Sequence, residues 1–191
     1  MSDASDSIDR RDENEQGPIR VRAGTVVDAS GIAAIHVSSW EGAYRGMIPD
    51  EWLDRRSAAR QTAIWEELLG GVGDPVDGRL PWVAVAEDGD TVIGFVSVSV
   101  PSRDEDADER TAEISALYVE PDRWRRGAGT ALVDAALAEA ARRGCVDATL
   151  WVLEPNARAR AFYERCGFAD DGGRQSRDDG WPGELRMRRG L

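Results

Sequence analysis

The sequence predicts an α/β fold in which helices cover the faces of a mixed β-sheet. Three observations support this fold class. Segments that alternate apolar and polar residues, as strands do, are interspersed with segments whose apolar residues recur at helical spacing. Three strand-like segments follow one another between residues 81 and 119, and after them strands alternate with helices. The expected order of elements is β-α-α-β-β-β-α-β-α-β-β.

The length of 191 residues fits one domain, which we place at residues 18–191. The preceding segment, residues 1–17, carries six acidic side chains and two arginines but almost no apolar side chains. Such a segment cannot bury enough apolar surface to offset the entropy lost on ordering. We therefore expect residues 1–17 to form a disordered acidic tail.

The first half of the domain is predicted to hold a strand, helical segments and a hairpin. Asp28 or Ser30 can cap a helix that continues to Tyr44, and Ser57 can cap a later helix. Residues 88–90, Asp-Gly-Asp, are a hairpin turn signal between two apolar runs. The expected elements are a strand at 19–22, helices at 28–44, 49–53 and 57–69, a loop at 70–79, and strands at 81–86 and 91–100.

The second half begins with an acidic loop at 103–109, which we expect to be solvated, and ends with two strands. We expect these last strands at the edges of the sheet, where their apolar residues favour a homodimer. Glycines at 144 and 167 end the two predicted helices. The expected elements are a strand at 111–119, a helix at 130–143, a strand at 146–153, a helix at 156–165, and strands at 168–169 and 184–188.

The composition excludes several classes of function. There are 24 basic and 36 acidic residues, a net charge of −12, whereas a nucleic-acid-binding protein needs a basic surface. All the basic residues are arginine, so no lysine chemistry is available. One histidine, His36, and two cysteines, Cys145 and Cys166, are too few for the usual metal sites, and we expect none. No apolar run of about 20 residues and no signal-like N-terminus is present, so we expect a cytoplasmic protein without membrane contact.

One candidate binding segment is the glycine-bracketed turn Arg126-Gly127-Ala128-Gly129, which follows a strand and opens a helix. The first turn of a helix presents unpaired backbone N–H groups at the positive end of its dipole, and this arrangement suits a phosphate. The glycines let a ligand approach the backbone closely. Taken alone, the same residues also fit an ordinary tight turn between a strand and a helix.

A second candidate segment is the predicted helix that begins at Asn156. Tyr163 lies seven residues after Asn156, so both lie on one helix face, and Ala159 between them leaves room for a flat ligand. Phe162 is offset from this face and can pack into the core. A phenol in this position can donate a proton to a leaving group. A half-buried tyrosine bonded to the backbone is the alternative interpretation.

In order, the two segments resemble the GNAT superfamily of acyl-CoA-dependent N-acyltransferases. The matching residues are Ala112-Glu113-Ile114-Ser115-Ala116-Leu117-Tyr118-Val119, Pro121, Arg126-Gly127-Ala128-Gly129-Thr130, Asn156, Phe162-Tyr163 and Gly167-Phe168. The strong match covers about residues 110–168. Trp124 departs from the family pattern, which has Gln or Arg there, and we expect Arg125 or Arg126 to supply the missing charge.

The resemblance implies a fold whose central sheet is splayed and an acetyl-CoA cosubstrate held by main-chain groups. The pantetheine arm would follow Leu117, Tyr118 and Val119 along a strand that carries a bulge and diverges from its neighbour. The remaining implied acetyl-CoA-binding residues are Arg125, Arg126, Gly127, Ala128, Gly129, Thr130, Asn156, Ala159 and Phe162.

The resemblance also implies direct acetyl transfer to a primary amine, either on a small molecule or on a protein. Glu113 is the candidate general base and Tyr163 the candidate general acid. The acceptor would contact Trp40, Tyr44 and Arg45, whereas we expect His36 to be structural. Two alternatives stay open: a CoA-binding regulatory module without activity, and a generic nucleotide-binding domain, against which the lack of lysine and of a GxGxxG motif argues.

Overall fold

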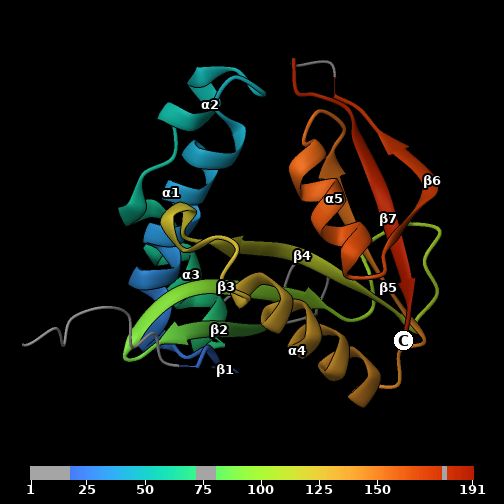
Figure 1. Cartoon of the computed structure of the whole chain (residues 1–191), viewed down its shortest axis with the longest axis horizontal. Helices are drawn as coiled ribbons and strands as arrows, with labels where there is room; N and C mark the ends of the chain where they lie inside the picture. Colours follow the sequence, from blue (N-terminus) through green and yellow to red (C-terminus); the bar gives the residue numbers. More distant parts are fainter. Residues whose placement is uncertain (1–17, 72–80, 178–179) are drawn as a thin grey trace, which may run out of the picture.

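The computed structural model describes residues 18–71, 81–177 and 180–191, and its centre is a seven-stranded sheet (Figure 1). The strand order is β1-β2-β3-β4-β5-β7-β6. The predicted acidic tail and most of the predicted loop at 70–79 lie outside the described residues. The strands are β1 (Arg20–Ala23), β2 (Trp82–Asp88), β3 (Thr91–Ser99), β4 (Thr111–Val119), β5 (Asp147–Leu153), β6 (Ala169–Gln175) and β7 (Glu184–Gly190).

Helices cover both faces of this sheet, which confirms the predicted mixed α/β fold. In Figure 1, α1 and α3 lie beside strands β1–β4, and α5 lies beside β5–β7. Ser57 caps α3 as predicted, since its Oγ accepts the N–H of Arg60 at 3.2 Å. Among the described residues, no helix is both long and apolar enough to cross a bilayer. The helices are α1 (Ala29–Tyr44), α2 (Asp50–Asp54), α3 (Ala58–Gly70), α4 (Ala128–Arg142) and α5 (Ala157–Arg165), with short 3-10 turns at Val26–Asp28 and Pro121–Arg123.

Alternate residues of the strands feed two apolar cores on opposite faces of the sheet. On one face, Leu132, Val133 and Ala136 of α4 pack onto Ile114 and Leu150. On the other face, α1 and α3 bury a second cluster, which consists of Ala29, Ile32, Ala33, Ile35, Trp65, Val83, Val85 and Phe95. The two sides of each central strand are therefore apolar, which explains why β2 and β3 read as continuous hydrophobic runs.

The middle of the sheet is antiparallel and carries one irregularity of functional interest. Val98 pairs with Ile114 and Ser97 with Ala116, so Ser115 is an extra residue in β4. The Oγ of Ser115 turns back to the carbonyl oxygen of Ser97 at 3.2 Å. This is a β-bulge, a feature that bends a strand and increases its twist.

Beyond the bulge, β4 separates from β5. The two strands pair in parallel at only three positions, from Thr111↔Asp147 to Glu113↔Thr149. From Ile114 onward no residue of β5 pairs with β4. The expected bulge and splay are therefore both present, and we call the unpaired stretch between Ile114–Val119 and residues 150–153 the β4–β5 gap.

The C-terminal strands differ from the prediction. The segment expected as an edge strand at 184–188 is the inner strand β7, which lies between β5 and β6 and whose Leu185 and Met187 fill the core beneath it. The predicted strand at 168–169 is longer, and as β6 it forms the edge, where Asp170, Asp171 and Arg174 are outside the core. The edge is thus polar, which removes the observation that favoured a homodimer.

The acidic loop before β4 is mostly exposed, as predicted, but two of its carboxylates are held against the sheet. Asp104 accepts the indole N–H of Trp151 at 2.8 Å, and its second oxygen lies 3.3 Å from Arg186. Arg186, which is only 7% exposed, also pairs with Asp106 and Asp171. The loop is therefore held against the β5–β7 part of the sheet by the Trp151 hydrogen bond and by the ion pairs of Asp104 and Asp106 with Arg186 of β7.

Candidate functional site

The turn before α4 has the backbone conformation of an anion-binding site. Arg125 and Gly127 have positive φ angles of 63° and 90°, and Gly127 is the N-cap of α4. The first intrahelical bond runs from the N–H of Ala131 to Gly127 O at 3.0 Å. The six N–H groups from Arg125 to Thr130 donate to nothing in the part of the chain that the structure describes. They converge at the positive end of a helix dipole, so they can bind a phosphate.

Trp124, the departure from the family pattern, supports this turn. Its indole Nε1 donates to the carbonyl oxygen of Val119 at 2.7 Å. The far edge of its ring would contact a Cβ placed on Gly42 of α1 at 3.6 Å. On the α5 side, the guanidinium carbon of Arg158 lies 3.7 Å from the centre of the Trp124 ring. Trp124 therefore joins α1, β4 and α5 next to the turn.

Arg125 and Arg158 flank the turn, and neither has a carboxylate partner among the described residues. Burial and then the neighbouring positive charge of Arg125 lower the pKa of Arg158. Two guanidinium groups that repel each other beside unpaired N–H groups are strained in the absence of an anion. Arg158 was not among the residues selected from the sequence. Its position two residues after the Asn156 cap, at the start of α5, is the local signal that could have identified it.

The backbone of β4 supplies one wall of the β4–β5 gap. The N–H of Glu120 donates to Ile93 O on β3 at 2.9 Å. Because successive peptide groups of a strand point in opposite directions, those of Val119 and Leu117 point away from β3 and toward the gap. The carbonyl oxygen of Val119 already accepts bonds from Ser39 and Trp124. The peptide groups of Leu117 have no partner strand on this side and stay available to a ligand.

The residues selected at α5 have different structural roles. Asn156 caps the helix, with its Oδ1 accepting the N–H of Ala159 at 3.1 Å. The ring of Phe162 lies against Gly129, so that a Cβ there would approach Phe162 Cζ to 3.2 Å. Phe162 therefore locks α5 onto the first turn of α4, and Gly129 is required for this close packing rather than for its φ angle.

Tyr163, near the end of α5, is packed between Phe162 and Phe168. Burial first, and then the neighbouring Tyr118 hydroxyl and Cys166 thiol, raise the pKa of Tyr163 well above its ordinary value. The phenol therefore stays protonated over the whole physiological range. Its hydroxyl forms no hydrogen bond with residues that the structure describes, so it is free to donate to a ligand.

Glu113 is buried at the closed end of the gap, where β4 and β5 still pair. Its carboxylate accepts three bonds from Arg103: from the backbone N–H at 3.1 Å, from Nε at 3.0 Å and from Nη2 at 2.7 Å. Only the bond from Nη2 ends on Oε1, whereas the other two end on Oε2. Arg103 therefore fixes the carboxylate in place, with acceptor capacity left mainly on Oε1.

The predicted acceptor residues separate into two groups. Trp40 and Tyr44 of α1 meet Tyr118, since Trp40 Nε1 donates to the Tyr118 hydroxyl at 2.9 Å and the Tyr44 hydroxyl lies 3.5 Å from it. The side chain of Tyr118 therefore packs against α1, and only the backbone of Tyr118 lies along β4. Arg45 is exposed and lies 3.5 Å from Asp50, apart from these rings. The aromatic cluster consists of Trp40, Tyr44, Trp52, Tyr118 and Trp181.

His36 borders this cluster. Its ring stacks on Tyr118 with centroids 5.0 Å apart and an angle of 28° between the planes. Burial, followed by the positive charge of Arg56, lowers the pKa of His36 to about 4. The imidazole is therefore neutral at physiological pH. Arg56 was also not selected from the sequence, because its short segment between two helices carries no local motif.

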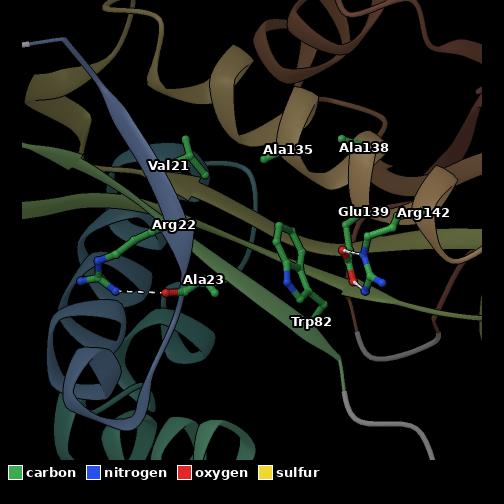
Figure 2. Close-up of a pocket in the computed structure, with 8 residues that line it drawn as sticks. All are labelled: Val21, Arg22, Ala23, Trp82, Ala135, Ala138, Glu139 and Arg142. Atoms are coloured by element: carbon green, nitrogen blue, oxygen red, sulfur yellow. Dashed lines mark hydrogen bonds and ion pairs between the residues drawn. The ribbon is translucent and has the colours of Figure 1, made fainter.

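Two open pockets lie elsewhere on the molecule. One, of about 330 Å³, lies between β1, the start of β2 and the second half of α4 (Figure 2). Figure 2 shows Trp82 facing the small side chains of Ala135 and Ala138, and Glu139 held by Arg142. The other pocket, of about 280 Å³, is lined by residues 101–104 and 107–109 of the acidic loop. Arg103 alone among these residues touches the site described above, so we do not assign catalysis to either pocket.

Comparison with known proteins identifies the family. The model described as "Acetyltransferase (GNAT) family" matches residues 37–168. The Mycobacterium tuberculosis protein named probable N-acetyltransferase Rv2775 is 30% identical over 158 residues, which cover 81% of this chain and 82% of the relative.

Solved structures share the fold. The PaiA N-acetyltransferase of Thermoplasma acidophilum, in complex with coenzyme A, has a TM-score of 0.70 at 20% identity, covering 92% of this chain and 100% of that one. YncA of Salmonella typhimurium, solved with acetyl-CoA, has a TM-score of 0.66 at 19% identity, covering 92% and 95%. With a family match over more than half of its length and a relative aligned over four fifths of it, this chain belongs to the GNAT family and is an acetyltransferase.

Proposed function

We propose that this protein transfers the acetyl group of acetyl-CoA directly to a primary amine. The observation that carries the proposal is the separation of β4 from β5 beyond Glu113, which leaves the peptide groups of Leu117 without a partner strand. A pantetheine arm has amides of its own and can take the place of the missing strand. The solved neighbours with coenzyme A and with acetyl-CoA have the same fold, which supports this choice of donor.

The phosphates of the donor are proposed to bind the turn before α4. The free N–H groups from Arg125 to Thr130 would take the pyrophosphate, and Arg125, Arg126 and Arg158 would supply positive charge. Asn156 and Ala159 would border the arm from the α5 side, and Phe162 would hold the two helices at the right separation.

The chemistry that we propose is a nucleophilic attack by the neutral amine on the thioester carbonyl carbon. The new C–N bond forms as the carbonyl π electrons move to oxygen, and the N–H of Leu117 would stabilise that oxyanion. Collapse re-forms the carbonyl and breaks the C–S bond. Tyr163 would then protonate the departing thiolate, because its buried hydroxyl is kept protonated.

Glu113 is the proposed acceptor of the proton that the amine loses, through a water molecule at Oε1. Direct contact is disfavoured because Arg103 already binds both carboxylate oxygens. An acyl-enzyme is not part of the proposal. Burial raises the pKa of both Cys145 and Cys166, so neither thiol has the thiolate character of a nucleophile.

The experiment that tests this function is an amine panel assayed with acetyl-CoA, in which thiol release and the acetyl mass gain of the acceptor are followed together. The proposal expects stoichiometric thiol and acetylated amine. Acetyl-CoA binding without transfer to any amine would instead favour a CoA-binding regulatory module. Displacement of CoA by ATP or NAD would favour a general nucleotide-binding domain.

A further inference from the structure

The acceptor side of the site contains an arginine without a counter-charge. The guanidinium of Arg56, in the link between α2 and α3, stacks on Trp40 with its carbon 3.2 Å from the ring centre. Across residues 18–71, 81–177 and 180–191, no side chain forms an ion pair or hydrogen bond with this guanidinium. Its Nε is buried and unpartnered. The terminal nitrogens Nη1 and Nη2 of Arg56 are not among the buried unpartnered atoms, so they can donate hydrogen bonds to a ligand.

An uncompensated arginine is conspicuous in a chain with a net charge of −12. Acidic side chains are abundant, and the arginines elsewhere are mostly paired with them. Removing a guanidinium from water without a partner is unfavourable, and burial lowers the pKa of Arg56 accordingly. Arginines with carboxylate partners include Arg20, Arg22, Arg103, Arg123, Arg142, Arg143, Arg174, Arg186 and Arg188.

Arg56 is connected to the reacting end of the gap through Tyr118. The Tyr118 hydroxyl accepts the indole N–H of Trp40, whose ring carries the Arg56 guanidinium. Tyr118 is electrostatically coupled to Arg56 on one side and to Tyr163 on the other. The positive charge therefore lies along the aromatic cluster that we assign to the acceptor, and not at the phosphate turn.

We propose that the acceptor is a small amine that also carries an anionic group of the carboxylate type, and that Arg56 binds this group. The inference deepens the proposed function and rests on it. The planar guanidinium, preoriented on Trp40, offers its terminal nitrogens to two oxygens at once. The hydroxyls of Tyr44 and Tyr118 lie in the same cluster and can add hydrogen bonds.

A negative charge lies near the same cluster. The carboxylate of Glu184, at the start of β7, contributes to the raised pKa of Tyr44 and of Tyr118, after burial as the main cause. An acceptor with both an anion and an amine would thus place the anion at Arg56 and the amine on the side of Glu184 and Tyr163. A polyamine has no group for Arg56 and would be repelled by it, so the overall acidity of the surface does not decide acceptor choice.

The test compares matched acceptors that differ in one charge. Amino acids and their carboxamides are assayed with acetyl-CoA, beside spermidine, using wild type, Arg56→Gln and Arg60→Gln. Arg60 is the matched control, because it is exposed on α3 and outside the cluster. In parallel, binding of each compound to the CoA-loaded protein is measured by calorimetry, so that recognition is scored even when transfer is absent.

The expected result is that wild type prefers a carboxylate over its carboxamide by about 10- to 100-fold in kcat/KM, or in affinity, which is the range for a hydrogen-bonded charge pair. Arg56→Gln should abolish this preference without changing the KM for acetyl-CoA, and Arg60→Gln should retain it. Three results would overturn the inference. The first is that wild type uses an amino acid and its carboxamide equally, and the second is that it prefers spermidine. The third is that Arg56→Gln loses activity equally on the amino acid and on its carboxamide. Failure of CoA binding would overturn the proposed function instead, and free protein would then be titrated for carboxylate preference.

Discussion

Tyr163 shows how burial, and not residue type alone, sets the protonation state of a candidate catalytic side chain. An exposed tyrosine also carries a proton at neutral pH, but water competes for its hydroxyl. Here Phe162 and Phe168 enclose the ring, and the hydroxyl has no partner among the described residues. The raised pKa of Tyr163 means that the protonated form persists in alkaline assays. Loss of this hydroxyl should therefore affect the chemical step and leave cosubstrate affinity unchanged.

The corresponding variant is Tyr163→Phe, which keeps the ring and its packing. We expect kcat to fall by about 100-fold, the lower end of the effect of general acid catalysis, with the Kd for acetyl-CoA unchanged. Stopped-flow thiol release and calorimetry on the same preparation measure the two quantities. Wild-type turnover by the variant would remove Tyr163 from the mechanism.

Glu113 gives a second prediction for a single residue. Glu113→Gln keeps the volume and removes the charge, so it should lower kcat by about 100-fold or more, and raising the pH should partly restore the rate because more of the amine is then neutral. Arg103→Gln is the companion variant, since it frees the carboxylate without removing it. A pH–rate profile of Glu113→Gln parallel to that of wild type would show that another group takes the proton.

Among the contacts between structural elements, the one between α4 and α5 lies next to the proposed CoA site. A Cβ at position 129 would approach Phe162 Cζ to 3.2 Å, so the ring would have to shift to admit a side chain there. Gly129→Val should force the ring away, destabilise the protein by about 1–3 kcal/mol and weaken CoA binding, because the turn before α4 moves with it. Gly190→Val is the control, since a Cβ at that position would meet open space. Thermal denaturation and CoA titration of both variants measure the effect.

Wild-type stability in Gly129→Val would show that the ring of Phe162 can move at no cost. A stable variant with unchanged CoA affinity would show that the contact between Gly129 and Phe162 does not influence CoA binding.

Most elements could be predicted because their signals are local. Ser57, Asn156 and the Asp-Gly-Asp turn specify the ends of α3, α5 and the β2–β3 hairpin. The motif residues from Glu113 to Phe168 likewise lie close together in sequence, so the resemblance located the proposed donor site.

The features that could not be predicted depend on partners distant in sequence. β7 becomes an inner strand only because β6 adds outside it, and no local pattern encodes strand order. The Arg103–Glu113 pair and the contact of Arg158 with Trp124 form only after the loop and α5 are in place. Arg56 and Trp40 are similarly brought together by the packing of α1 against the α2–α3 link.

On the scale of the whole molecule, the many ion pairs make stability dependent on acid pH. Arg22 holds the pKa of Asp28 at about 2, and Arg142 and Arg143 do the same for Glu139. A carboxyl whose pKa is lower in the folded than in the unfolded chain stabilises the fold above its unfolded value and loses this contribution as pH falls. We therefore expect the melting temperature to be constant near neutrality and to fall between about pH 4.5 and pH 2.

Asp28→Asn isolates one part of this effect. The variant should lose roughly 2 kcal/mol at pH 7 and much less at pH 2.5, because Asp28 is buried and its hydrogen bond with Arg22 lowers its pKa to about 2. Melting curves from pH 2 to pH 8 measure the difference. A constant difference across that range would show that the pair with Arg22 does not act through its charge.

The most direct test of the central claim is a calorimetric titration of the 191-residue chain with coenzyme A. The account predicts one CoA bound per chain, about tenfold weaker binding in Arg158→Gln, and no displacement by ATP at equal concentration. Absence of measurable binding of both CoA and acetyl-CoA to the folded wild-type protein would contradict it.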